Sequence, residues 1–159
     1  MKKTKLTMVF SLLSVMLMAQ NDKPGIAFKD MKIEKAYASY LELKDALVAS
    51  KTARAKEAAE KLRTSLVSLK EGNNAMAEAT KIAGSATLDE IRKAFAKLSA
   101  EMATVVKDGK LSKGMIYLEY CPMANNNTGA FWLSNEKEIK NPYFGDKMLK
   151  CGSVRETIH

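Results

Sequence analysis

The sequence predicts a mainly helical protein: an antiparallel helical bundle of three long helices and one short helix, followed by a small C-terminal β-hairpin and tail. Residues 28–107 contain no proline, and their apolar residues recur at spacings of three and four, which is the period of an amphipathic helix. Residues 114–151 hold two of the three prolines, both cysteines and the only tryptophan. The first segment is therefore predicted to be a scaffold, and the second is predicted to shape a site.

Four helices are predicted in the first segment. Thr87 and Glu90 form the Thr-x-x-Glu pattern of a capping box, which is typical of the first residues of a helix. Glycines at Gly84 and Gly109 follow the third and fourth periodic stretches, as glycine commonly does where a helix ends. The predicted helices cover residues 28–50, 52–69, 75–83 and 87–108.

The second segment predicts a hairpin. Residues 115–120 are rich in aliphatic and aromatic side chains, which favours a strand. Residues 125–129, Asn-Asn-Asn-Thr-Gly, are typical of a turn, and residues 130–133 are predicted to return as the second strand. Residues 141–146 contain Asn, Pro and Gly and predict a further turn.

The N-terminus predicts a secretory signal peptide over residues 1–19. Three lysines precede a thirteen-residue apolar run that is free of charge, and polar residues follow Ala19. This order is typical of a signal peptide cleaved near Ala19, and the run is short for a membrane span. A retained anchor or a core helix is the alternative. The sequence thus predicts an exported, periplasmic protein with a linker at residues 20–27, a single domain at residues 28–158 and no stable membrane anchor.

Charge and composition argue against several classes of function. The whole chain has a net charge of +8, but lysines alternate with glutamates along the predicted helices, which is typical of solvated helix faces. We therefore expect no nucleic-acid partner. The only histidine is His159, which leaves no base for a Ser or Cys triad. No phosphate-binding glycine loop is found either, and the protein is predicted not to be an enzyme.

The most distinctive residues are four sulfur-containing side chains in the second segment, namely Cys121, Met123, Met148 and Cys151. Thiolates and thioethers are soft ligands that select Cu(I) over zinc or hard cations, and zinc would also call for histidines. One helical turn would bring Met148 and Cys151 to the same side. The sequence therefore predicts a soft-metal site, with Cu(I) as the preferred ion and Met115 as an additional ligand.

A disulfide between Cys121 and Cys151 is the competing interpretation, since exported proteins commonly oxidise their cysteines. Closing this loop would stabilise the fold by roughly 3–4 kcal/mol in the chain-entropy description. The protein would then be a non-catalytic structural or interaction module that binds a partner near residues 131–132 or 143–144. A thiol redox role is a third interpretation.

The C-terminal residues also resemble a family, the bacterial DUF-3347 family. The similar runs are residues 120–125 (Tyr-Cys-Pro-Met-Ala-Asn), 129–134 (Gly-Ala-Phe-Trp-Leu-Ser), 139–145 (Ile-Lys-Asn-Pro-Tyr-Phe-Gly) and 148–152 (Met-Leu-Lys-Cys-Gly). Members are exported helical domains, found alone or attached to the periplasmic adaptor subunits of heavy-metal efflux pumps of the RND class. The resemblance extends over about residues 30–158.

A shorter resemblance points the same way. Residues 120–123 resemble the start of the heavy-metal motif Tyr-x-Cys-Pro-Met-His-Pro, although Ala124 and Asn125 stand where His-Pro would follow. Met148 and Cys151 would then complete the ligand set. Together the two resemblances imply an accessory protein of copper handling or efflux, whose partner is a periplasmic efflux adaptor subunit or a metallochaperone.

Overall fold

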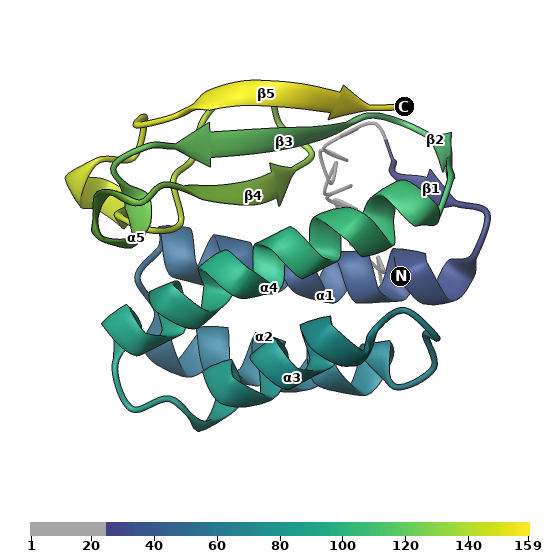
Figure 1. Cartoon of the computed structure of the whole chain (residues 1–159), viewed down its shortest axis with the longest axis horizontal. Coiled ribbons are helices and arrows are strands. Elements are labelled where there is room, and N and C mark those ends of the chain that lie inside the picture. The colour runs from purple at the N-terminus through teal and green to yellow at the C-terminus, as the bar shows by residue number, and fades with distance from the viewer. Residues whose placement is uncertain (1–24) are drawn as a thin grey trace, which may run out of the picture.

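The computed structural model describes residues 25–159, and this part of the chain is mainly helical with small antiparallel sheets (Figure 1). The predicted signal peptide and most of the predicted linker lie outside the described residues. The four main helices are α1 (Met31–Val48), α2 (Thr52–Leu66), α3 (Asn73–Gly84) and α4 (Leu88–Asp108). These helices confirm the prediction of a mainly helical protein. The apolar stripes that predicted them are buried in the core.

The helix ends follow local capping more closely than apolar periodicity. Thr87 and Glu90 form the predicted capping box at the start of α4. The first helix begins at Met31 and not at Phe28, because Asp30 accepts a hydrogen bond from the backbone N–H of Lys32 as its N-cap. Residues ahead of this cap, Ala27–Phe28, form strand β1 and pair with β2 (Leu111–Lys113).

The C-terminal segment forms a three-stranded antiparallel sheet with the order β4-β3-β5. Its strands are β3 (Ile116–Cys121), β4 (Ala130–Ser134) and β5 (Ser153–Ile158). Strands β3 and β4 pair as the predicted hairpin, in a register that runs from Tyr117 opposite Ser134 to Cys121 opposite Ala130. The predicted tail is in fact a third strand, since β5 pairs along β3.

Helices and sheet lie in layers (Figure 1). Helices α1 and α4 lie next to the sheet, and α2 and α3 lie on the far side of them. Strand β4 is the sheet strand nearest the helices. There the backbone N–H of Leu133 donates a 3.0 Å hydrogen bond to the hydroxyl of Tyr40, which also bonds the hydroxyl of Ser99 at 2.8 Å. This buried contact joins the edge of the sheet to α1 and α4.

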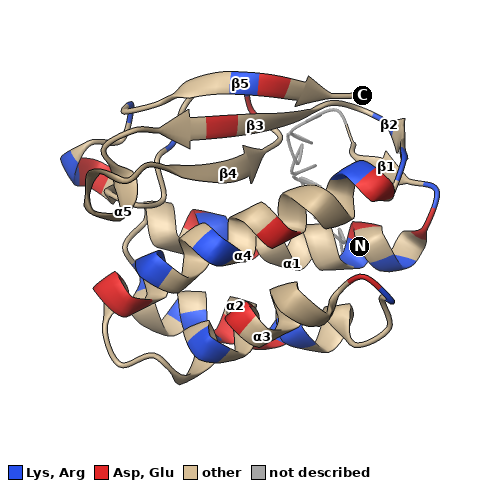
Figure 2. Ribbon diagram, in the orientation of Figure 1, with Lys and Arg blue, Asp and Glu red and all other residues tan. Residues whose placement is uncertain are grey.

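The surface charges are mixed. Figure 2 shows Lys and Arg interspersed with Asp and Glu along the helices, as expected for solvated faces. Among the helices in the described part of the chain, none combines the length and apolar character needed to cross a bilayer.

Candidate functional site

The two cysteines meet where the loop before β5 crosses the end of β3. Cys121 is the last residue of β3 and is buried, whereas Cys151 lies just before β5 and is half-buried. Both are free thiols, and their Sγ atoms are 2.7 Å apart. The hydrogen bond between the two thiols, reinforced by burial, raises the pKa of the Cys151 thiol to about 11. The structure therefore brings together the two predicted cysteine ligands.

Asn141 holds the segment that carries Cys151. It is fully buried, and its side-chain amide donates a 2.7 Å hydrogen bond to the backbone carbonyl of Cys151. Its side-chain oxygen accepts from the backbone N–H groups of Tyr143 at 2.8 Å and Phe144 at 3.3 Å. Its own backbone N–H donates to the carbonyl of Leu149. One side chain thus joins the predicted turn region to the backbone of Cys151.

Met148 and Cys151 are the two ends of a single turn. The backbone N–H of Cys151 donates a 3.0 Å hydrogen bond to the carbonyl of Met148, and Met148 is half-buried. The turn follows a short 3₁₀ helix, η1 (Gly145–Lys147), and residues 148–151 are not part of a helix. This turn brings the backbone of Met148 close to that of Cys151.

The other two methionines occupy different places. Met123 is 45% exposed and follows β3, whereas Met115 is 44% exposed and precedes it. An extended strand rises about 3.3 Å per residue, which separates Met115 from Cys121 by about 20 Å. The prediction that Met115 is an additional ligand is therefore wrong, because β3 runs straight between the two.

Met123 lines a pocket of about 640 Å³ between the start of α4 and the loops that follow β3 and β4. One wall carries the charged residues Asp89, Glu90, Arg92 and Lys93 of α4. The opposite walls are residues 125–127 and the group Tyr143, Phe144 and Lys147. Neither cysteine is among the residues that line it, so the pocket lies beside the sulfur pair and does not include it.

Arg92 fastens one side of this pocket. Its guanidinium donates to the backbone carbonyl of Pro142 at 3.0 Å, to that of Leu47 at 3.3 Å and to the hydroxyl of Ser50 at 3.1 Å. Burial lowers the pKa of this guanidinium. Arg92 therefore ties the loop that leads to Cys151 to the end of α1.

The loop between β3 and β4 has an unusual backbone. Asn125, Asn126 and Asn127, within the short element α5 (Ala124–Asn127), all have positive φ angles, of 51°, 57° and 62°. Asparagine tolerates the left-handed region better than most residues, but three in succession are rare. Hydrogen bonds from the backbone N–H of Gly129 to Ala124 and between the side chains of Asn125 and Thr128 hold this conformation. A connection predicted as a turn is thus a left-handed loop.

Sequence reasoning missed Glu119, a fully buried carboxyl group two residues before Cys121 on β3. In the described part of the chain, neither of its carboxyl oxygens has a hydrogen-bond partner, nor does the indole N–H of its cross-strand neighbour Trp132. Burial raises the pKa of Glu119 to about 8, an effect that the charge of Lys44 partly offsets. A single charged residue in an otherwise apolar strand is the sequence signal that could have identified it.

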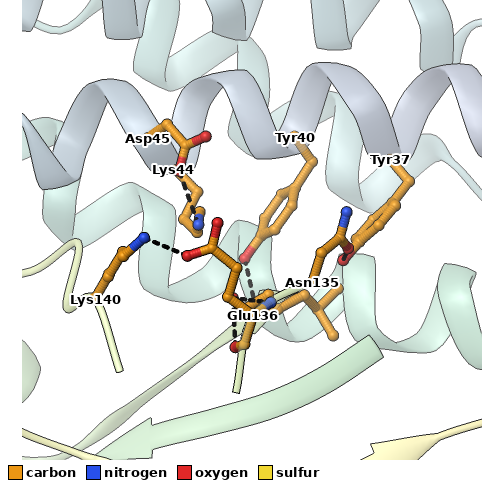
Figure 3. Close-up of polar contacts among 9 residues, drawn as sticks. Tyr37, Tyr40, Lys44, Asp45, Asn135, Glu136 and Lys140 are labelled. Atoms are coloured by element: carbon orange, nitrogen blue, oxygen red, sulfur yellow. Dashed lines mark hydrogen bonds and ion pairs between the residues drawn. The ribbon is translucent and has the colours of Figure 1, made fainter. Parts of the chain in front are cut away.

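A polar network joins the end of β4 to α1 (Figure 3). The hydroxyl of Tyr37 donates a 2.6 Å hydrogen bond to the side chain of Asn135, and Lys140 forms an ion pair with Glu136. On α1, the buried Lys44 pairs with Asp45 at 2.8 Å. The bond between Tyr37 and Asn135 therefore holds the start of the segment that follows β4 against α1, on the path from β4 to Asn141.

Within residues 25–159, no three side chains of the types His, Cys, Asp and Glu gather as a metal site. The predicted set contains only two residues of these types, the cysteines. A soft ion would therefore depend on the two thiols with thioether help.

Residues 36–114 match the model of a family described as "Protein of unknown function (DUF3347)". The matched range begins within α1 and ends at Gly114, just ahead of β3, so it precedes the runs in residues 120–152 that carried the resemblance. No curated protein and no solved structure shows a significant match to the chain.

Proposed function

Because this chain belongs to the DUF3347 family, whose description assigns no function, we propose one from its own residues: an exported accessory protein of copper handling that binds Cu(I). The ligands are the thiolates of Cys121 and Cys151, with the thioether of Met148 as a third. The observation that carries the proposal is the 2.7 Å approach of the two Sγ atoms, which come from segments thirty residues apart.

The chemistry of the pair suits a soft monovalent ion. Thiolate and thioether sulfur select Cu(I), whereas hard cations prefer oxygen ligands. Binding replaces the two thiol protons, so affinity is expected to rise with pH. The hydrogen bonds of Asn141 to Cys151 and its neighbours preorganise one ligand, which limits the ordering cost of binding.

The proposal does not include catalysis. Among residues 25–159, neither thiol has a hydrogen-bonded base beside it, since the hydrogen-bond partner of each is the other thiol. The protein would buffer Cu(I) or pass it on, with a periplasmic efflux adaptor subunit or a metallochaperone as partner.

An anaerobic Cu(I) titration of the reduced protein against a chromogenic Cu(I) chelator tests this proposal. We expect one equivalent of Cu(I) to be withdrawn from the chelator, with loss of binding in Cys121→Ser and Cys151→Ser and weaker binding in Met148→Leu. Met115→Leu is the matched control and is expected to bind as the parent protein does. Failure of the parent protein to compete with a weak chelator would exclude a Cu(I) site.

A structural disulfide is the second candidate, and the same sulfur approach favours it. Oxidation would join the end of β3 to the segment before β5, with a stabilisation of roughly 3–4 kcal/mol for a loop of this length. The exposed Phe131, 38% accessible, would then belong to a partner-binding surface. Alkylation and mass measurement of protein isolated from the cell envelope without reductant distinguish the candidates, because the disulfide leaves no thiol to alkylate.

A further inference from the structure

We propose that Met123 is an uptake ligand: its thioether takes Cu(I) from an anionic thiolate complex held in the 640 Å³ pocket and passes the ion to Cys121 and Cys151. This inference rests on the proposed function, and it assigns Met123 a kinetic role instead of a permanent place in the site. It also assigns the pocket beside α4 to the incoming copper complex.

Accessibility separates the sulfur atoms into two groups. Cys121 is fully buried and Cys151 is half-buried, so a complexed ion has no open approach to both thiols at once. The side chain of Met123, in contrast, is 45% exposed and faces the pocket. Only Pro122 lies between Met123 and Cys121, so their Cα atoms are at most about 7.6 Å apart. Met123 is therefore an exposed sulfur side chain only two residues along the chain from the buried thiol.

The pocket is bounded by both chain segments that supply sulfur ligands. Residues 123–127 follow Cys121 after the single residue Pro122, and residues 143–147 lead directly into Met148. The first segment is held by the left-handed asparagines and the second by Arg92 and Asn141. Such a fixed frame keeps the thioether in place without a ligand and lowers the cost of binding one.

The charges that line the pocket suit an anionic complex. Cu(I) bound by two thiolates carries one negative charge, and the lining includes the cations Arg92, Lys93 and Lys147. Of the two carboxylates, Glu90 already accepts hydrogen bonds from the backbone N–H groups of Ala86 and Thr87. Those bonds leave the charge of Glu90 in place, so the lining has three cations and two carboxylates, Asp89 and Glu90, and its formal net charge of +1 favours an anion.

The transfer is a sequence of ligand exchanges without a change in oxidation state. The thioether of Met123 first displaces one thiolate from the incoming complex. The thiols of Cys121 and Cys151 then bind Cu(I) in turn, and each loses its proton as it does so. The two displaced thiolates take up these two protons, so atoms and charge balance and the anionic bis-thiolate form is restored on the protein.

Stopped-flow measurement of Cu(I) uptake from a copper–glutathione complex tests this role. Met123→Leu is expected to slow uptake by a factor of about ten or more, within the range over which association rates vary among variants, while the equilibrium Kd stays unchanged. Met115→Leu, equally exposed at the other end of β3, is the control and is expected to load at the parent rate. An unchanged rate for Met123→Leu overturns the proposal, and so does a loss of affinity as large as that of Cys151→Ser.

A second measurement is independent of the thiol pair. Silver(I), a soft ion that is not readily oxidised, is added to Cys151→Ser protein labelled with ¹³C at its methionine methyl groups. The methyl signal of Met123 is expected to shift at the first additions, ahead of that of Met115. If the Met123 signal does not shift, the uptake site is overturned, even if the parent protein binds Cu(I). If the Met123 signal shifts but the parent protein does not bind Cu(I), only the proposed function is contradicted.

Discussion

The side-chain amide of Asn141 donates a hydrogen bond of 2.7 Å to the backbone carbonyl of Cys151. Because Asn141 is fully buried and also accepts from the N–H groups of Tyr143 and Phe144, its loss would leave several buried polar groups without partners. The position of the half-buried thiol therefore depends on a residue ten positions away that has no reactive chemistry of its own.

Asn141→Ala is expected to lower the free energy of unfolding by about 1–3 kcal/mol, the cost of leaving buried polar groups unsatisfied. It should also make the Cys151 thiol react faster with an aromatic disulfide reagent. Urea unfolding and the rate of thiol modification measure the two effects. Asn74→Ala, at an exposed site in α3, is the control, and equal effects in the two variants would contradict the anchoring role.

Because Glu119 is buried, the free energy of unfolding is expected to fall as pH rises. Its pKa is about 8 in the folded protein and near 4.3 in an unfolded chain, so between these values only the unfolded state releases the proton. Its contribution is fully present below the unfolded pKa and is lost as pH rises through the folded pKa. Each unit of difference between the two pKa values is worth about 1.4 kcal/mol.

Glu119→Gln is therefore expected to flatten the decline of the unfolding free energy between about pH 4 and pH 8 and to be the more stable protein at the alkaline end. Chemical denaturation at a series of pH values tests this expectation. The exposed Glu71→Gln serves as the comparison, and a Glu119→Gln profile that is parallel to that of the parent protein would refute the account.

Arg92→Ala is expected to loosen the loop before Cys151. It removes hydrogen bonds to Pro142, Leu47 and Ser50, and a bond to a charged donor is worth about 1.5–3 kcal/mol. Hydrogen exchange of the backbone N–H groups in residues 143–151 should accelerate more than that of α2. Lys93→Ala, exposed on the next position of α4, is expected to leave these exchange rates unchanged.

The thermal stability of the protein is expected to depend strongly on side-chain shape in the left-handed loop. Asn126→Val places a β-branched residue at a φ of 57°, which is expected to cost about 1–2 kcal/mol. Asn126→Gly removes the steric conflict and should equal or exceed the parent protein in thermal stability. Melting temperatures of the two variants test the point, and equal values for Val and Gly would show that the loop relaxes to another conformation.

The helices could be predicted because their signals are local. The stripe that includes Ile91, Phe95 and Leu98 repeats with the helical period, and the Thr87–Glu90 box is complete within four residues. Strand β5 could not, because Ser153–Ile158 gains its hydrogen bonds from β3, more than thirty residues earlier. Its sequence, Ser-Val-Arg-Glu-Thr-Ile, lacks the apolar character that distinguishes a buried strand.

The residues of the candidate site also fall into those that the sequence indicated and those that it did not. The chemistry of Cys121 and Cys151 was visible in the sequence, and the structure brings the two thiols together. The roles of Asn141 and Arg92 were hidden, because both act mainly on backbone carbonyl and N–H groups that any sequence would supply. Glu119 was hidden for a related reason, since its burial depends on how the loop after β4 and the helical layer enclose β3.

Trp132 is the only tryptophan in the sequence, and it lies against the chain next to Cys151. A Cβ atom on Gly152 would come within 2.8 Å of the indole ring, and the ring also packs edge-on against Tyr143. The protein therefore has a single indole fluorophore in contact with the segment that carries its half-buried thiol. Its emission offers a label-free optical record of each event at the sulfur pair, in real time and without an added dye.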